Sequence, residues 1–73
     1  MRTGSLYGLL APFTYGDSPA LDALRDACEA GDWQSCDDLY RQSAPGTEYE
    51  EFGDTCGGRQ PVGTGLWCVD SMV

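Results

Sequence analysis

Apolar residues recur at helical spacing in two neighbouring segments of this chain. Leu21, Leu24 and Cys28 lie three and four residues apart, and a second series with the same spacing runs from Trp33 through Cys36 to Tyr40. This spacing is typical of helices that bury one face. We therefore predict helices over residues 19–30 and 33–43. Since the connection between them is only one or two residues long, they should form an antiparallel hairpin.

Residues that start and stop helices agree with these boundaries. Ser18 can cap the first helix, Pro19 suits its first position, and Asp22 places a carboxylate in its first turn. Gly31 should end that helix and Asp32 should cap the next one. The second helix should end before Pro45 and Gly46.

A third, shorter helix is predicted over residues 48–55. Thr47 followed by Glu50 has the capping-box pattern, and Tyr49, Phe52 and Cys56 should face inward. The chain from Gly57 to Gly65 is rich in glycine and proline and reads as a loop, after which Trp67 should fill the small core.

These elements predict a small, mainly α, disulfide-stapled domain. It consists of a helical hairpin and a short third helix with irregular, Gly/Pro-rich ends. We assign residues 1–16 to an irregular arm or linker remnant, residues 17–70 to the single domain and residues 71–73 to a tail that frays together with Asp70.

The four cysteines of this 73-residue chain indicate a disulfide framework. Four cysteines allow three pairings. We favour Cys28–Cys36 with Cys56–Cys68, because each pair closes a local ring at helix ends. Structural disulfides place the chain in an oxidising compartment, so we expect an extracytoplasmic domain, secreted or exposed on a membrane-anchored protein.

Charge and composition narrow the classes of partner and of chemistry. Twelve acids and four arginines give a net charge of −8, and histidine and lysine are absent. Nucleic acid is therefore an unexpected partner, whereas a basic protein or another cationic ligand suits this charge. The missing residue types exclude Ser/His and Cys/His couples, Cys/His zinc fingers and lysine Schiff bases, and we expect no enzyme.

No segment reads as membrane-spanning, since the apolar run from Leu6 to Phe13 is short and is interrupted by Gly8 and Pro12. We expect no membrane insertion by this chain itself. A disulfide domain without an export signal suggests a fragment of a longer exported or membrane-anchored protein. We expect the chain to be a monomer or a part of such a larger chain.

Two sets of acids are candidate sites. Asp37, Asp38, Glu50 and Glu51 should form an exposed acidic helical face, and Asp37–Arg41 and Arg25–Glu29 are spaced as surface ion pairs. Glu48, Glu50, Glu51 and Asp54 lie within seven residues and offer the oxygen ligands that calcium requires, although the EF-hand pattern is absent.

Two resemblances extend this interpretation. The stretch from Ala27 to Tyr40, with cysteines eight positions apart around Gly31-Asp32, resembles the helical hairpin of tetratricopeptide-like cysteine-rich repeat proteins. Only one hairpin is present, so the concave surface of a stacked array is not implied. The longer stretch from Tyr15 to Gly58 contains Cys-Asp-Asp-Leu-Tyr and Glu-Tyr-Glu-Glu-Phe-Gly-Asp-Thr-Cys-Gly. It is similar to an uncharacterised acidic domain of actinobacterial membrane-anchored and secreted proteins, which implies an extracytoplasmic location and no activity.

The sequence therefore predicts a non-enzymatic interaction module with an acidic helical face. The alternatives are a structural cap or spacer and a small calcium-binding domain. An interaction module should leave aromatic or leucine side chains exposed beside its acids, whereas a spacer should bury nearly all of them.

Overall fold

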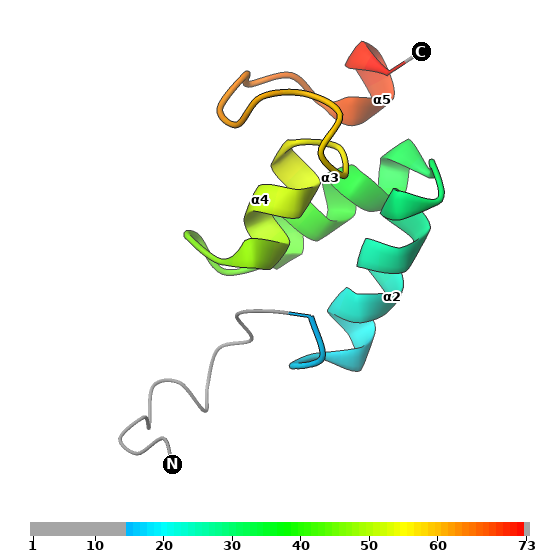
Figure 1. Ribbon diagram of the computed structural model, residues 1–73, viewed down its shortest axis with the longest axis vertical. Coiled ribbons are helices and arrows are strands. Elements are labelled where there is room, and N and C mark those ends of the chain that lie inside the picture. The colour runs from blue at the N-terminus through cyan, green and yellow to red at the C-terminus, as the bar shows by residue number, and fades with distance from the viewer. Residues whose placement is uncertain (1–14, 73) are drawn as a thin grey trace.

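The computed structural model describes residues 15–72, and this part of the chain contains four helices and no β-strand. They are α2 (Pro19–Glu29), α3 (Trp33–Gln42), α4 (Glu48–Asp54) and α5 (Cys68–Ser71). Helix α3 packs against all three of the others (Figure 1). The predicted mainly α, disulfide-stapled class is confirmed. The arm expected over residues 1–16 lies outside the described residues except for Tyr15 and Gly16.

Helices α2 and α4 begin where the local capping signals place them. Ser18 Oγ accepts a hydrogen bond from the Leu21 amide at 3.2 Å, and Thr47 Oγ1 accepts one from the Glu50 amide at 3.2 Å. Glu50 Oε1 completes a variant of the capping box by accepting from the Gly46 amide at 2.8 Å. Because each signal acts within four residues, the starts of α2 and α4 are properties of the local sequence.

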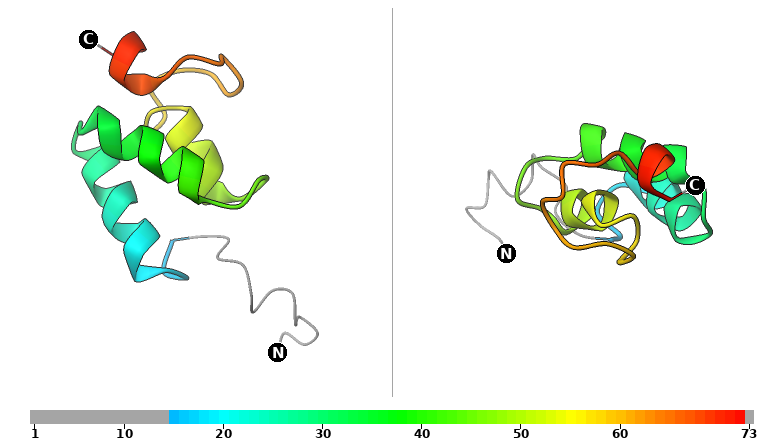
Figure 2. Two further views of the ribbon diagram at one scale, coloured as in Figure 1. Left: turned by 180° about the vertical axis from the view of Figure 1, so that it is seen from behind. Right: turned by 90° about the horizontal axis from the view of Figure 1, so that it is seen from above.

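Helices α2 and α3 form the predicted hairpin, which the left view of Figure 2 shows from behind. Gly31 makes the turn with φ near 101°, a left-handed conformation that glycine adopts without strain. Cys28 at the end of α2 and Cys36 at the start of α3 are then 4.6 Å apart between Cα atoms and form a disulfide. The second disulfide joins Cys56 to Cys68, so both predicted pairings are confirmed.

The core has two adjoining parts. All four cysteines are at most 1% exposed and form one cluster, against which Trp33, Phe52 and Met72 pack. Leu21, Leu39 and Tyr49 form the other cluster, with Leu24 and Phe52 beside it. Phe52 therefore links the two clusters, and the inward positions predicted for Tyr49, Phe52 and Cys56 are confirmed.

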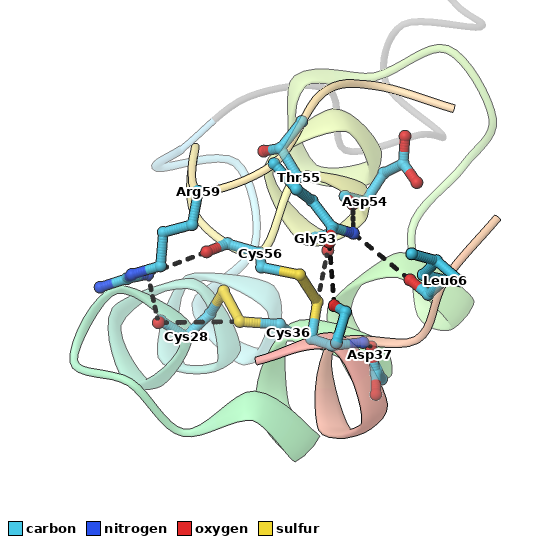
Figure 3. The surroundings of a disulfide bond; sticks show 12 residues. Cys28, Cys36, Asp37, Gly53, Asp54, Thr55, Cys56, Arg59 and Leu66 are labelled. Carbon is cyan, nitrogen blue, oxygen red and sulfur yellow. Dashed lines mark hydrogen bonds between the residues drawn. A yellow bond between two sulfur atoms is a disulfide. The ribbon is translucent and has the colours of Figure 1, made fainter. Parts of the chain in front are cut away.

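Arg59 ties the end of the first disulfide hairpin to the loop after α4. Its Nη1 donates to the Cys56 carbonyl at 2.8 Å and lies 3.4 Å from the Cys28 carbonyl (Figure 3). Its Nη2 donates to the Glu29 carbonyl at 2.8 Å. The guanidinium stacks on the Trp33 ring at 5.0 Å from its centroid. A cation at the carboxyl end of α2 also complements the helix dipole.

Two expectations for the end of the chain are wrong. The tail assigned to residues 71–73 and the fraying expected from Asp70 conflict with α5, which includes Asp70 and Ser71, while Val73 lies outside the described residues. Trp67 does not fill the core, because its side chain is 42% exposed. The four buried cysteines and Tyr49 occupy that space instead.

A buried tyrosine fastens the start of α2 to α4. The Tyr49 hydroxyl donates to Asp22 Oδ1 at 2.6 Å and accepts from the Ser18 amide at 3.2 Å. The same Asp22 oxygen accepts from the Gly16 amide at 2.9 Å. Arg25 lies between the Tyr15 and Phe52 rings, at 5.0 and 4.1 Å from their centroids.

This arrangement predicts a loss of stability in alkali. Burial raises the pKa of the Tyr49 phenol above 10.0, and the hydrogen bond to Asp22 raises it further. Since the folded state disfavours the phenolate, this stabilisation is complete below pH 10.0 and is lost as the pH rises through the folded pKa. We expect the melting temperature of the native chain to fall above that pH.

Tyr49→Phe should lower the free energy of unfolding by about 1–2 kcal/mol at neutral pH. Its melting temperature should also fall less in alkali than that of the native chain. Thermal unfolding followed by circular dichroism across this pH range measures both effects. Tyr15→Phe is the control, because Tyr15 is half exposed and its loss should cost less at neutral pH. An alkaline decline unchanged in Tyr49→Phe would contradict the prediction.

Candidate binding surface

A small pocket opens where α3, α4 and the loop before α5 meet. Helix α3 supplies Asp37 and Tyr40, α4 supplies Gly53 and Asp54, and the loop supplies Gly65, Leu66 and Trp67. We call this the Tyr40 pocket; its volume is about 140 Å³. At its floor Gly53, which has no side chain, lets α4 approach the backbone of α3 at Cys36 and Tyr40.

A set of polar contacts holds the loop that forms one wall of the pocket. Gln60 Nε2 donates to the carbonyls of Asp54 and Leu66 at 3.1 and 3.3 Å. Asp54 Oδ2 accepts from the Gly63 amide at 2.7 Å. Ser71 Oγ donates to Gln60 Oε1 at 2.9 Å, which connects the loop to α5. The Gly/Pro-rich segment is thus fixed although it contains no regular structure.

Asp37 positions α5, although thirty-one residues separate it in the sequence from Cys68, the first residue of that helix. Its carboxylate accepts from the Cys68 amide at 2.7 Å and from the Val69 amide at 3.2 Å, and only 3% of the residue is exposed. It therefore caps a helix whose own preceding residue, Trp67, makes no side-chain cap. The expectation that Asp37 belongs to the exposed acidic face is wrong, and so is the Asp37–Arg41 ion pair.

We predict that Asp37→Asn destabilises the domain by about 1–2 kcal/mol. The amide oxygen can still accept one backbone N–H, but the amide nitrogen would then face the second donor and leave it unpaired in a buried site. Chemical denaturation followed by far-ultraviolet circular dichroism measures the change. Asp38→Asn, at the adjacent and more exposed position, should cost far less, and equal losses for the two variants would contradict this role for Asp37.

Arg41 pairs with Asp38 instead. Its Nη2 donates to Asp38 Oδ1, and its guanidinium lies over the Trp67 ring at 5.6 Å from the centroid. The other predicted ion pair, Arg25–Glu29, is present at 3.7 Å. Arg25, Arg41 and Arg59 all stack on aromatic rings of this chain, so the positive side chains of residues 15–72 are engaged internally. Exposed acids include Asp26, Glu29, Asp32, Glu48 and Glu51.

A second depression adjoins the Tyr40 pocket along α4. We call it the Glu50 groove; it has a volume of about 270 Å³ and shares Tyr40 and Asp54 with the pocket. Its remaining lining residues are Gly46, Thr47, Glu50, Glu51 and Val62. Two of the acids predicted for the acidic face, Glu50 and Glu51, thus lie beside Tyr40. Asp38 stays near the same surface through its contact with Arg41.

Four large apolar side chains remain exposed around these two depressions. Val62 is 62% exposed, Leu66 57%, Trp67 42% and Tyr40 38%. The Tyr40 and Trp67 rings meet edge to face with their centroids 6.0 Å apart. We call this group the apolar patch. Sequence reasoning placed Trp67 inside and did not single out Val62 or Leu66. The available signal of their exposure was their position in or directly after a Gly/Pro-rich loop. Such a loop has few side chains that could cover them.

The four acids considered for calcium are not gathered into one site. Glu50 turns back to the Gly46 amide, and Asp54 holds the Gly63 amide. Among residues 15–72, no three acidic, cysteine or histidine side chains are arranged to hold a metal ion. The structure therefore does not bring Glu48, Glu50, Glu51 and Asp54 together in the arrangement expected for a calcium site. Consecutive positions such as Glu50 and Glu51 point in different directions on a helix.

No helix within residues 15–72 has both the length and the apolar character needed to cross a membrane. Comparison with protein-family models, with characterised proteins and with solved structures yields no match to this chain.

Proposed function

We propose that this chain is a non-enzymatic, extracytoplasmic interaction module that binds a basic partner. The observation that carries the proposal is the apolar patch of Tyr40, Val62, Leu66 and Trp67 next to acidic side chains. Exposed apolar groups that cluster around a depression are typical of binding surfaces, and tyrosine and tryptophan are enriched in them. A structural spacer has no need of this exposure.

The charge distribution supports a basic partner. Eleven of the twelve acids lie between Asp17 and Asp54, and the arginines of this segment are stacked on aromatic rings. An uncompensated negative surface accelerates association with cationic partners and disfavours acidic ones. Two disulfides support the extracytoplasmic location, because such bonds persist in oxidising compartments. A longer exported or membrane-anchored parent protein would present the domain outside the cell.

The experiment is affinity capture from cell-envelope extract at low salt, using matched variants of the immobilised chain. Leu66→Ser removes part of the apolar patch, whereas Pro61→Ser changes an exposed residue of the same loop that lines neither depression. Glu51→Gln and Glu29→Gln each remove one exposed negative charge, and only Glu51 lines the Glu50 groove. We expect the captured amount of one protein to fall with Leu66→Ser and with Glu51→Gln. The controls Pro61→Ser and Glu29→Gln should leave that amount unchanged.

Added salt should weaken that capture, because screening reduces attraction between exposed charges. Capture that is equal for all four variants would argue against this surface and would favour the spacer. The location is tested separately. Cysteines of the chain in native cells should resist thiol alkylation until a reductant is added, and rapid alkylation without it would count against an oxidising compartment.

A further inference from the structure

We propose that the Tyr40 pocket binds a single lysine side chain of the partner. This inference rests on the proposed function and specifies the chemistry at one point of the surface. At about 140 Å³ the pocket is well below the roughly 300–1,000 Å³ of pockets that enclose drug-sized molecules. It suits one side chain carried by a peptide that continues over the surrounding surface.

The lining of the pocket matches a chain of methylene groups that ends in a positive charge. Tyr40, Leu66 and Trp67 provide aromatic and aliphatic walls, while Asp37 and Asp54 provide two carboxylates. Within residues 15–72, no basic side chain lines the pocket. A lysine stem can pack along apolar walls while its ammonium group reaches the acids.

The hydrogen bonds already made by the two carboxylates favour lysine over arginine. Both oxygens of Asp37 accept backbone N–H groups, and one oxygen of Asp54 accepts the Gly63 amide. A guanidinium gains most from two parallel bonds to one carboxylate, an arrangement for which both oxygens must be accessible in the plane. An ammonium group needs only separate lone pairs in several directions, and each carboxylate oxygen retains at least one.

The experiment uses the disulfide-bonded chain and three short peptides that differ at one position. The peptides are acetyl-Gly-Lys-Leu-Gly-amide and its arginine and norleucine analogues. Norleucine keeps the unbranched apolar stem and removes the charge. Titrations are followed by two-dimensional ¹H–¹⁵N spectra, with the Trp67 indole N–H and the Gly53 and Gly65 amides as reporters of the pocket. The Glu50 and Glu51 amides report on the adjoining groove.

We expect the lysine peptide to shift the pocket reporters in a saturable way and to bind at least about fivefold more tightly than either analogue. Asp54→Asn should weaken lysine binding by about the same factor, since the amide oxygen can still accept from Gly63 while the charge is lost. Glu29→Gln is the charge-matched control and should leave binding unchanged. Thermal unfolding confirms that both variants remain folded.

Three outcomes would overturn the inference. Equal affinity for the norleucine peptide would make the pocket a purely apolar site, and tighter binding of the arginine peptide would exclude the lysine preference. Shifts confined to the Glu50 and Glu51 amides would place cation binding in the groove instead. In each of these cases, envelope capture that still depends on Leu66 would leave the proposed function standing, so the two failures are distinguishable.

Discussion

Reduction of both disulfides should unfold the domain completely. Cys28–Cys36 and Cys56–Cys68 close rings with sequence separations of 8 and 12, and the chain-entropy model assigns roughly 2.5–3 kcal/mol to each ring. A domain of this size has a total stability near the lower end of about 5–15 kcal/mol. The two bonds together therefore contribute about as much as the total free energy of unfolding of such a domain.

The loss of buried contacts adds to the loss of the rings. The four cysteines form one of the two core clusters, and free thiols would have to be accommodated in a space that now holds bonded sulfurs. We expect the reduced and alkylated chain to lose its helical circular dichroism signal at room temperature. The native chain under the same conditions is the control.

The two bonds can also be removed one at a time. Cys28→Ala with Cys36→Ala should weaken a hairpin that the Gly31 turn and Arg59 still hold. Cys56→Ala with Cys68→Ala should loosen the segment that carries Leu66 and Trp67. The hydrogen bonds of Asp37 and Gln60 discussed above would then hold this segment against the helices. A reduced and alkylated chain that keeps cooperative thermal unfolding would contradict our estimate of the contribution of these bonds.

The elements that the sequence predicts correctly are those with local causes. The start of α2 follows from Ser18 and Pro19, and the start of α4 follows from Thr47 and Glu50, within four residues in each case. The disulfide pairing follows from the same helix ends, because the hairpin brings Cys28 and Cys36 together at its turn. Local capping and short-range closure need no knowledge of the rest of the fold.

The errors concern residues whose surroundings are assembled from distant segments. Helix α5 has only four residues, and the carboxylate that caps it comes from α3. Asp37 looked like half of an exposed acidic pair with Asp38. Its spacing of four from Trp33 places it on the same strip of α3 as an aromatic residue that packs against the cysteine cluster, and this was the available signal of burial.

The apolar patch could not be predicted from hydropathy either. A tryptophan next to a cysteine suggests a core position, yet the space inside so small a domain is filled by the cystines, Leu39 and Tyr49. Trp67 and Leu66 then lie on the outside, where the loop and α3 form the Tyr40 pocket. The candidate site is thus a consequence of how much core volume is available, which depends on the whole fold.

Gly53→Ala should destabilise the domain by about 3 kcal/mol, because α3 and α4 touch through their backbones at this residue. A Cβ atom at position 53 would lie 2.7 Å from the Cys36 carbonyl oxygen, 2.7 Å from the Tyr40 nitrogen and 3.0 Å from the Tyr40 Cα atom. These are backbone atoms of a helix and cannot rotate away. The helices must separate, and the buried contacts of Leu39 and Tyr49 between them would be loosened.

The sign of this effect distinguishes packing from helix propensity. Alanine favours an exposed helix over glycine by about 1 kcal/mol, so propensity alone predicts that Gly53→Ala stabilises α4. Glu51→Ala, at an exposed position of the same helix, is the control and should change the free energy of unfolding little. Chemical denaturation measures all three chains, and a Gly53→Ala variant as stable as the native chain would refute close contact of the two helices.

The same substitution connects the fold to the candidate site. Gly53 lines the Tyr40 pocket between Asp37 and Tyr40 on α3 and Asp54 on α4. A Cβ atom at position 53 would press on the α3 backbone at Tyr40, and the separation of the two helices would shift Asp54 relative to Tyr40. We therefore expect Gly53→Ala to weaken binding of the lysine peptide even at temperatures where the variant is fully folded. Glu29→Gln, at a residue that lines neither the pocket nor the groove, should retain that binding.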